Sequence, residues 1–300
     1  MSTPLKLLAF SAGLLAVFGS MFLAGRALVP AETVANWTRE ADESDSEHGA
    51  MDSGHASAGH ESGAMGDSQV RGLSVEQDGY RLSPVTAPPV PGSPGRLSFR
   101  IIGPDGMPQV EFETSHEKDL HLIVVRSDGD RFRHVHPRFD SGTWSLPWTW
   151  DEGGSYRVFA DFVPGGATDS PNVTLGRNVE VAGDFEPVAR PTSRSDSVAG
   201  FDVSVAGELR AGQGSPLAFT VKQGNRPETR LQPYLGAFGH LVALREGDLA
   251  YLHVHPDEGG GTGPEIRFVA EVPSPGRYLL YLDFKVGGVV HTAEFVLEAK

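Results

Sequence analysis

The sequence predicts an all-β protein in which two tandem Ig-like or cupredoxin-like β-sandwich repeats follow an N-terminal transmembrane helix and a disordered linker. The chain has 37 Gly and 22 Pro in 300 residues, which indicates many turns rather than long helices. Short apolar runs are separated by Gly, Pro, Asp and Ser, as in sandwiches and barrels. The same blocks of sequence then recur at a spacing of about 120 residues.

Four pairs of matching blocks define the repeats. They are residues 79–82 with 200–203, 97–101 with 217–221, 121–137 with 240–256, and 156–162 with 278–284. A period as long as a whole domain favours two sandwiches over a solenoid. We therefore expect one sandwich over residues 76–185 and another over residues 198–300, each of roughly seven strands. The Pro- and Ser-rich run near residues 186–197 is the expected link between them.

The first 26 residues contain a candidate membrane segment. Leu7–Gly25 is nineteen residues long and uncharged, close to the ~20 residues that cross a bilayer. The run exceeds the ~7–15-residue core of a signal peptide, which favours a transmembrane anchor over residues 1–26 and leaves a cleaved signal peptide as the alternative. We expect a single-pass protein of the cell membrane with its C-terminal domains outside the cytoplasm; the alternative is a secreted protein.

Residues 27–75 are expected to be a disordered acidic linker, because they lack periodicity and are rich in Ser, Gly, Ala and acid. Residues 27–68 hold nine Asp or Glu and one Arg, so they supply −8 of the formal charge of −14. The linker also carries five potential metal ligands, His48, Met51, His55, His60 and Met65. Such tracts capture metal ions without a fixed fold, and the alternative is a solvated linker in which these residues occur by chance.

Composition excludes several classes of function. The net charge is negative, and only mildly so outside the linker, so it indicates no nucleic-acid-binding surface. The chain has no cysteine, which excludes disulfides, catalytic thiols and blue-copper sites. Any metal ion must therefore be held by His, Met or carboxylate groups.

The gapless block of the first repeat predicts a β-hairpin that gathers three histidines. A two-residue turn at Asp128-Gly129, with positive φ at both positions, places His121 opposite His136 and Ile123 opposite His134. All three histidines then share one face of the hairpin. Directly opposed Cα atoms lie ~4.5–5.5 Å apart, so the imidazoles can reach one ion.

The second repeat predicts the same arrangement. A turn at Gly247-Asp248 places His240 opposite His255 and His253 opposite Val242. Neutral imidazoles suit Cu(II), Zn(II) or Ni(II), and the Irving–Williams order together with the linker methionines favours copper. The alternative is that these are buried histidines bonded to backbone, because His121 shares its face with Ile123.

Four further residues are weaker candidates. Asp161 and Asp283 occupy the same place in both repeats, within strands that ordinarily exclude Asp, so each is a metal ligand, a carboxylate that orients a ligating His, or a structural hydrogen-bond acceptor. His291 is expected opposite Phe284, on the other face from Asp283. His116 aligns with Leu235 and is a candidate for the first site alone.

The chain resembles a family of exported or membrane-anchored actinobacterial proteins of unassigned function, some labelled as heavy-metal-binding. The resemblance spans about residues 72–299 and rests on the motifs at residues 116–125, 231–245, 251–256 and 291–295. It implies the sandwich fold and an extracytoplasmic location more than any particular chemistry.

These observations favour a non-enzymatic, membrane-anchored protein that binds or buffers copper or zinc outside the cytoplasm. Its expected partners are the metal ion and a membrane metal transporter or another envelope protein, with no nucleic acid. The alternative is an Ig-like interaction module of the cell envelope with structural histidines. An enzyme is the least favoured class, because no nucleophile elbow, phosphate-cradling loop or catalytic carboxylate pair is evident in the sequence.

Overall fold

A computed structural model describes residues 70–166, 170–252, 254–256 and 263–300, and for His255 the backbone alone. These residues belong to one compact unit, residues 64–300. The expected membrane anchor, the linker and the linker ligands His48, Met51, His55, His60 and Met65 lie outside the described residues. Within the part of the chain that the structure describes, no helix is long and apolar enough to span a membrane.

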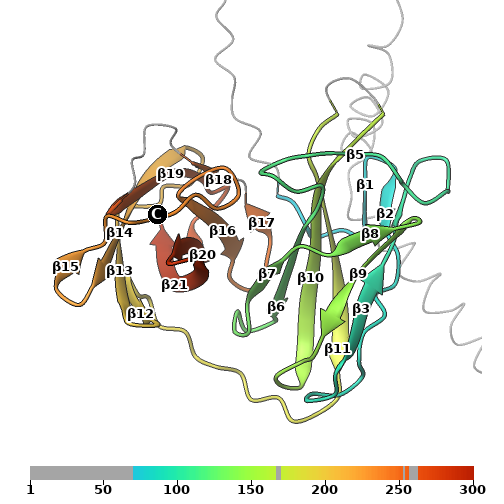
Figure 1. Cartoon of the computed structure of the whole chain (residues 1–300), viewed down its shortest axis with the longest axis horizontal. Coiled ribbons are helices and arrows are strands. Elements are labelled where there is room, and N and C mark those ends of the chain that lie inside the picture. Colours follow the sequence, from blue (N-terminus) through green and yellow to red (C-terminus); the bar gives the residue numbers. More distant parts are fainter. Residues whose placement is uncertain (1–69, 167–169, 253, 257–262) are drawn as a thin grey trace, which may run out of the picture. The chain divides into compact units, whose positions relative to one another are not determined.

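The described chain is all-β, and its first repeat contains three antiparallel sheets (Figure 1). The largest sheet has the order β11-β10-β6-β7, with β5 on β10, and consists of β5 (Phe112–Glu113), β6 (His121–Arg126), β7 (Arg133–Val135), β10 (Gly154–Pro164) and β11 (Val173–Val181). A sheet of order β3-β9-β8 consists of β3 (Gly95–Phe99), β8 (Arg138–Asp140) and β9 (Thr143–Trp148). A sheet of order β1-β2-β4 consists of β1 (Glu76–Gln77), β2 (Tyr80–Leu82) and β4 (Ile101–Ile102).

The second repeat contains two antiparallel sheets. One has the order β12-β13-β14-β19-β18, with β15 on β14, and consists of β12 (Ser195–Val198), β13 (Phe201–Ala206), β14 (Gly214–Gln223), β15 (Arg226–Pro227), β18 (Val254–Pro256) and β19 (Glu265–Glu271). The other has the order β17-β16-β20-β21 and consists of β16 (Gly239–Arg245), β17 (Tyr251–Leu252), β20 (Gly276–Val286) and β21 (Val289–Ala299).

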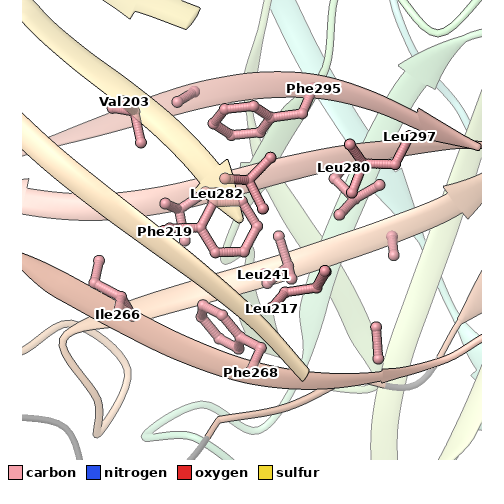
Figure 2. Close-up of a cluster of buried hydrophobic side chains, with 14 of the residues drawn as sticks. Val203, Leu217, Phe219, Leu241, Ile266, Phe268, Leu280, Leu282, Phe295 and Leu297 are labelled. Carbon is pink, nitrogen blue, oxygen red and sulfur yellow. The ribbon is translucent and has the colours of Figure 1, made fainter. Parts of the chain in front are cut away.

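Each repeat has a core of its own between its sheets. In β13 burial alternates residue by residue, as expected when one face of a strand meets the core and the other meets water. In the second repeat, Phe219 and Phe268 pack edge to face, 5.8 Å apart between ring centroids, among the apolar side chains drawn in Figure 2. Trp150 and Tyr156 lie in the corresponding core of the first repeat. The duplicated sandwich predicted from the sequence is thereby confirmed.

A third apolar cluster joins the two repeats, and we call it the seam. Every residue of β6 is buried, because Leu122 and Val124 face their own core while Ile123 and Val125 face the seam. Strand β16 also faces two clusters: Leu241 and Ala243 lie in the core of its own repeat, and Val242 and Leu244 lie in the seam. The seam also includes Phe159, Leu249, Tyr251, Leu279, Tyr281 and Val296. By alternation, His121 and His240 point toward the seam.

The predicted hairpin registers are confirmed where strands pair. Ile123 lies opposite His134, Leu244 opposite Tyr251, and Phe284 opposite His291. The predicted turn conformations at the two histidine hairpins are wrong. At Asp128-Gly129 only Gly129 has a positive φ, and an Arg126 N–H to Asp130 oxygen bond closes a longer loop.

The second hairpin differs from its prediction in the same way. Gly247 and Leu249, rather than Gly247 and Asp248, have positive φ. In each hairpin an arginine pairs with a turn aspartate, Arg126 with Asp128 and Arg245 with Asp248. These ion pairs hold the longer loops in place.

Two smaller predictions also need correction. The expectation of roughly seven strands per repeat is too low for the described residues. Two-residue strands such as β1, β5 and β15 add to the number, and Arg100 separates β3 from β4, which belong to different sheets, whereas β14 runs unbroken through the matching block. The expected link extended to residue 197, yet Ser195–Val198 forms β12 and pairs with β13.

Candidate metal centre

Histidines from both repeats converge at one edge of the seam. The His121 and His240 rings are stacked, 5.5 Å apart between centroids and nearly parallel at 4°. The two residues occupy equivalent places at the start of β6 and at the second position of β16, so the duplication brings them face to face. One nitrogen from each of His121, His134 and His240 lies within 4.8 Å of the others.

The β6–β7 hairpin supplies two more imidazoles, as its register predicts. His134 Nε2 lies 3.0 Å from His121 Nδ1, and His136 Nε2 lies 3.2 Å from the same atom. The prediction that the three histidines of this hairpin share one face is therefore confirmed. His134 also approaches His240, with 4.8 Å between ring centroids.

A carboxylate from the other repeat fixes the orientation of His134. Its Nδ1 lies 2.8 Å from Asp283 Oδ2, and Thr292 donates its hydroxyl to Asp283 Oδ1 at 2.6 Å. Both side chains of the His134–Asp283 pair are almost fully buried. Asp283 thus makes the contact with a histidine, here one of the first repeat, that the orienting role requires.

When His121 and His134 are both neutral, their hydrogen bonds leave two nitrogen lone pairs pointing at one another. A neutral imidazole has one N–H and one lone pair. Neutral His134 donates from Nδ1 to Asp283, so its Nε2 keeps the lone pair. His121 Nε2 lies 3.0 Å from the Ser115 carbonyl oxygen, so its proton sits there and its Nδ1 keeps the lone pair. These two lone pairs face each other at 3.0 Å, an arrangement that a shared cation stabilises.

The spacing of these nitrogens suits a transition-metal ion. An ion about 2.05 Å from two nitrogens that are 3.0–3.2 Å apart has an N–metal–N angle of about 95–105°. That angle lies between the square-planar and tetrahedral values adopted by Cu(II) and Zn(II). The His121–His134 and His121–His136 nitrogen pairs thus each have the separation of two ligands on one ion.

Electrostatics favour the neutral form of three imidazoles, those of His121, His136 and His240. Burial, with repulsion from His134, lowers the pKa of His121 to about 4. Burial and repulsion from His134 and His121 lower the pKa of His136 to about 3. Burial, and after it repulsion from His134 and His121, lowers the pKa of His240 well below its ordinary value. Neutral imidazoles bind a metal ion without first losing a proton.

His116 lies beside the cluster on a tight turn. Ser115 and Lys118 exchange two backbone hydrogen bonds, and the two residues between them have positive φ, 48° at His116 and 64° at Glu117. The His116 ring lies 5.5 Å from that of His240 and 6.1 Å from that of His121. In the second repeat Leu235 occupies the equivalent αL position, so His116 has no counterpart there, as the alignment predicts.

The pairing predicted for the second histidine hairpin is wrong beyond Leu252. Strand β17 pairs with β16, but β18 crosses to the other sheet, where the His255 backbone pairs with Val269 rather than with His240. His253 and the side chain of His255 lie outside the described residues. His240 joins the histidines of the first repeat.

Two other candidates contribute no nitrogen to the cluster, although Asp161 lies opposite His121 in the β6–β10 register. Asp161 accepts a 2.7 Å hydrogen bond from Thr174, the counterpart of the Asp283–Thr292 bond, so the structural role proposed for it applies, with a side chain rather than loop backbone as donor. His291 packs against Phe284 and Phe201, away from the histidine cluster, because it faces the core of its own repeat.

Sequence reasoning missed the composite nature of the centre and the residue Tyr234. Tyr234 lies 6.5 Å from His136 between ring centroids, and burial, with repulsion from Asp283, raises its pKa to about 12. The unbroken apolar run Leu122–Val125 was the available signal, since a strand buried on both faces needs a partner on each.

The fold and site together define a duplicated β-sandwich protein with a histidine cluster between its repeats. The chain belongs to the family described as "Domain of unknown function (DUF8832)", whose model matches residues 74–180 and again residues 196–300. No curated protein matches the chain significantly.

Several solved structures are similar at low identity. A chimeric titin Z1Z2 tandem is 14% identical, covers 70% of this chain and 92% of its own, and has a TM-score of 0.18. Domains 4 and 5 of the S-layer protein SbsC are 9% identical, with 75% and 98% covered and a TM-score of 0.23. A Salmonella alpha-2-macroglobulin variant is 16% identical, with 77% and 15% covered and a TM-score of 0.23. At such TM-scores these likenesses carry no argument about function.

Proposed function

We propose that this protein binds one Cu(II) or Zn(II) ion, non-enzymatically, at a centre built by both repeats. The observation that supports the proposal is the 3.0 Å approach of His121 Nδ1 to His134 Nε2, with the other ring nitrogens of these residues directed at the Ser115 carbonyl and at Asp283. His136 and His240 complete the donor set, and Asp283 orients His134. Ligands that are all neutral nitrogens suit borderline divalent ions, among which the Irving–Williams order favours Cu(II).

The proposed role is to hold or buffer the ion outside the cytoplasm, next to the membrane. The uncharged run Leu7–Gly25 and the acidic, histidine-bearing linker support this location. The partner in this role is a membrane metal transporter or another envelope protein that supplies or receives the ion.

The test is a competition titration of Cu(II) and Zn(II) on the full chain with the five linker ligands replaced by Ser, so that the folded repeats alone are measured. The matched variants are His134→Gln, which removes a central ligand, and His291→Gln, which removes a histidine outside the cluster. We expect the first variant to lose affinity by at least tenfold and the second to bind as the parent does. Equal affinity in both variants would refute the proposal.

A second candidate is an interaction module of the envelope in which the histidines are structural. It is supported by the bonds that His121 and His134 already make to Ser115 and Asp283. The two functions differ in a thermal melt. An ion bound to the native state raises Tm by mass action, whereas structural histidines leave Tm unchanged when Cu(II) or Zn(II) is added.

A further inference from the structure

The members of the histidine cluster differ in their access to water. The side chain of His134 is 1% exposed, and His121 is buried as a whole residue. His136 and His240 are partly buried, whereas His116 is exposed. A hydrated ion arriving from solvent therefore cannot meet His121 or His134 first.

His116 is placed to bridge solvent and the buried nitrogens. Its ring contacts those of His121 and His240 edge to face, yet it is not among the three histidines whose nitrogens lie within 4.8 Å of one another. The αL–αL turn that carries it is pinned by two Ser115–Lys118 backbone bonds. The same turn is tied to the centre, because the Ser115 carbonyl oxygen accepts from His121 Nε2.

We propose, building on the metal-binding function above, that His116 is the entry ligand: it receives the divalent ion from solvent and passes it to the donor set of His121, His134, His136 and His240. No atom changes oxidation state in this transfer. The ion exchanges bound water for the imidazole of His116, and then that imidazole for the buried ones. His116 thus holds the ion in passage and not in the final complex.

Charges around the turn modulate this entry. Lys118 repels charge at His136, and it also repels an arriving cation. Asp119, which accepts a 2.8 Å hydrogen bond from Thr114, is exposed, lines the same pocket as Lys118 and attracts a cation. Neutralising Lys118 and Asp119 should therefore change the association rate in opposite directions.

A competing route runs past His136. A surface pocket of about 570 Å³ is lined by His136, Lys118, Asp119 and Arg138 among others. His136 Nε2 already lies at ligand distance from His121 Nδ1, so it belongs to the final donor set. Loss of His136 must weaken equilibrium binding, whereas loss of an entry ligand need not. The two routes therefore differ in a kinetic measurement.

The experiment is stopped-flow association and release of Zn(II), with a chromophoric chelator as the probe, on the full chain with its linker ligands replaced by Ser. The key variant is His116→Asn, because Asn tolerates the αL conformation and lacks the imidazole. We expect association and release to slow by a similar factor of at least fivefold, with Kd changed less than threefold. His116→Gly should behave alike, and His136→Gln should instead raise Kd.

Two charge variants and one control complete the test. Lys118→Gln should speed association about threefold and Asp119→Asn should slow it, with both effects fading at 1 M salt. Lys222→Gln, on the exposed face of β14, should leave the association rate unchanged. Wild-type rates in His116→Asn, with normal Kd, would overturn the entry role while leaving metal binding intact. A parent chain that binds no Zn(II) or Cu(II) would overturn both.

Discussion

Asp283 of the second repeat lies 2.8 Å from the Nδ1 atom of His134 in the first repeat. This contact crosses the seam and joins residues 149 positions apart in the chain. It makes the tautomer of His134, and so the availability of its Nε2, depend on a carboxylate that the other repeat supplies. A metal centre at this place therefore needs both repeats folded and packed together.

Replacing that carboxylate should weaken metal binding. Asp283→Asn removes the acceptor that fixes His134, and loss of such an orienting carboxylate typically costs 10- to 100-fold in affinity. A competition titration with Zn(II) measures the change. The matched comparison is Asp161→Asn, because Asp161 holds Thr174 in the same way but bonds no histidine among the described residues. Asp161 lies opposite His121 in the β6–β10 register, so a smaller loss of affinity is expected there. If both variants lose affinity equally, the orienting role of Asp283 is wrong.

The histidine cluster should make the metal-free protein less stable in acid. The pKa of His121 falls from 6.5 to about 4 on folding, and that of His136 to about 3. A lowered pKa means that the unfolded chain binds more protons than the folded chain. The free energy of unfolding is therefore highest above pH 6.5 and falls as the pH drops toward 4. The slope is about 1.4 kcal/mol per pH unit for each group.

Urea unfolding at several pH values, with a chelator present, measures this slope. The double variant His121→Asn, His136→Gln should have a flatter profile between pH 6.5 and 4. A parent protein whose unfolding free energy is constant over that range would contradict the neutral, buried state of these imidazoles.

The two equivalent arginine–aspartate pairs test how far burial of an arginine raises its contribution to stability. The side chain of Arg126 is 1% exposed, and it bonds Asp128 through two nitrogens and Glu152 through a third. Arg126→Ala leaves buried carboxylate charge unpaired and should cost about 3–5 kcal/mol of unfolding free energy. The side chain of the equivalent Arg245 is 24% exposed. Arg245→Ala should therefore lower the free energy of unfolding by less than half as much. Urea denaturation measures the loss of unfolding free energy in each variant. Equal losses would contradict the expectation that the more buried arginine contributes more.

The seam should make the two repeats unfold together. Leu244 is fully buried there, and Leu244→Ala should cost about 2–5 kcal/mol. With Trp37 replaced by Phe, tryptophan fluorescence reports the first repeat, because Trp144, Trp148 and Trp150 lie there. Far-UV circular dichroism reports both repeats. We expect the two probes to show one coincident transition in the parent protein. Separate transitions would mean that the seam contributes little.

Much of this architecture was predictable from the sequence. The turn residues and the spacing of the duplicated blocks fixed the hairpin registers, so Ile123 opposite His134 and Phe284 opposite His291 follow from period-two alternation and turn position alone. Turn type was harder, because the side chain of Asp128 is tied to Arg126 and caps the amide of Asp130, which lengthens the loop.

The composite centre was not predicted, for a physical reason. Local pairing rules describe one sheet at a time, and the approach of His121 to His240 is a contact between two sheets across the seam. The same limit explains the error at His255: the chain leaves β17 for another sheet, and nothing in the alternation of Tyr251–Pro256 marks the crossing. Three-dimensional packing decided both outcomes.

The most direct test of a single centre shared by the repeats is to count bound ions. Native mass spectrometry of the Zn(II)-loaded chain, with the linker ligands replaced by Ser, gives the number per molecule for the parent, for His134→Gln and for His240→Gln. A shared centre predicts one ion in the parent and marked loss of that ion in each variant, although the substitutions lie in different repeats. Two ions in the parent, with one retained by each variant, would contradict it.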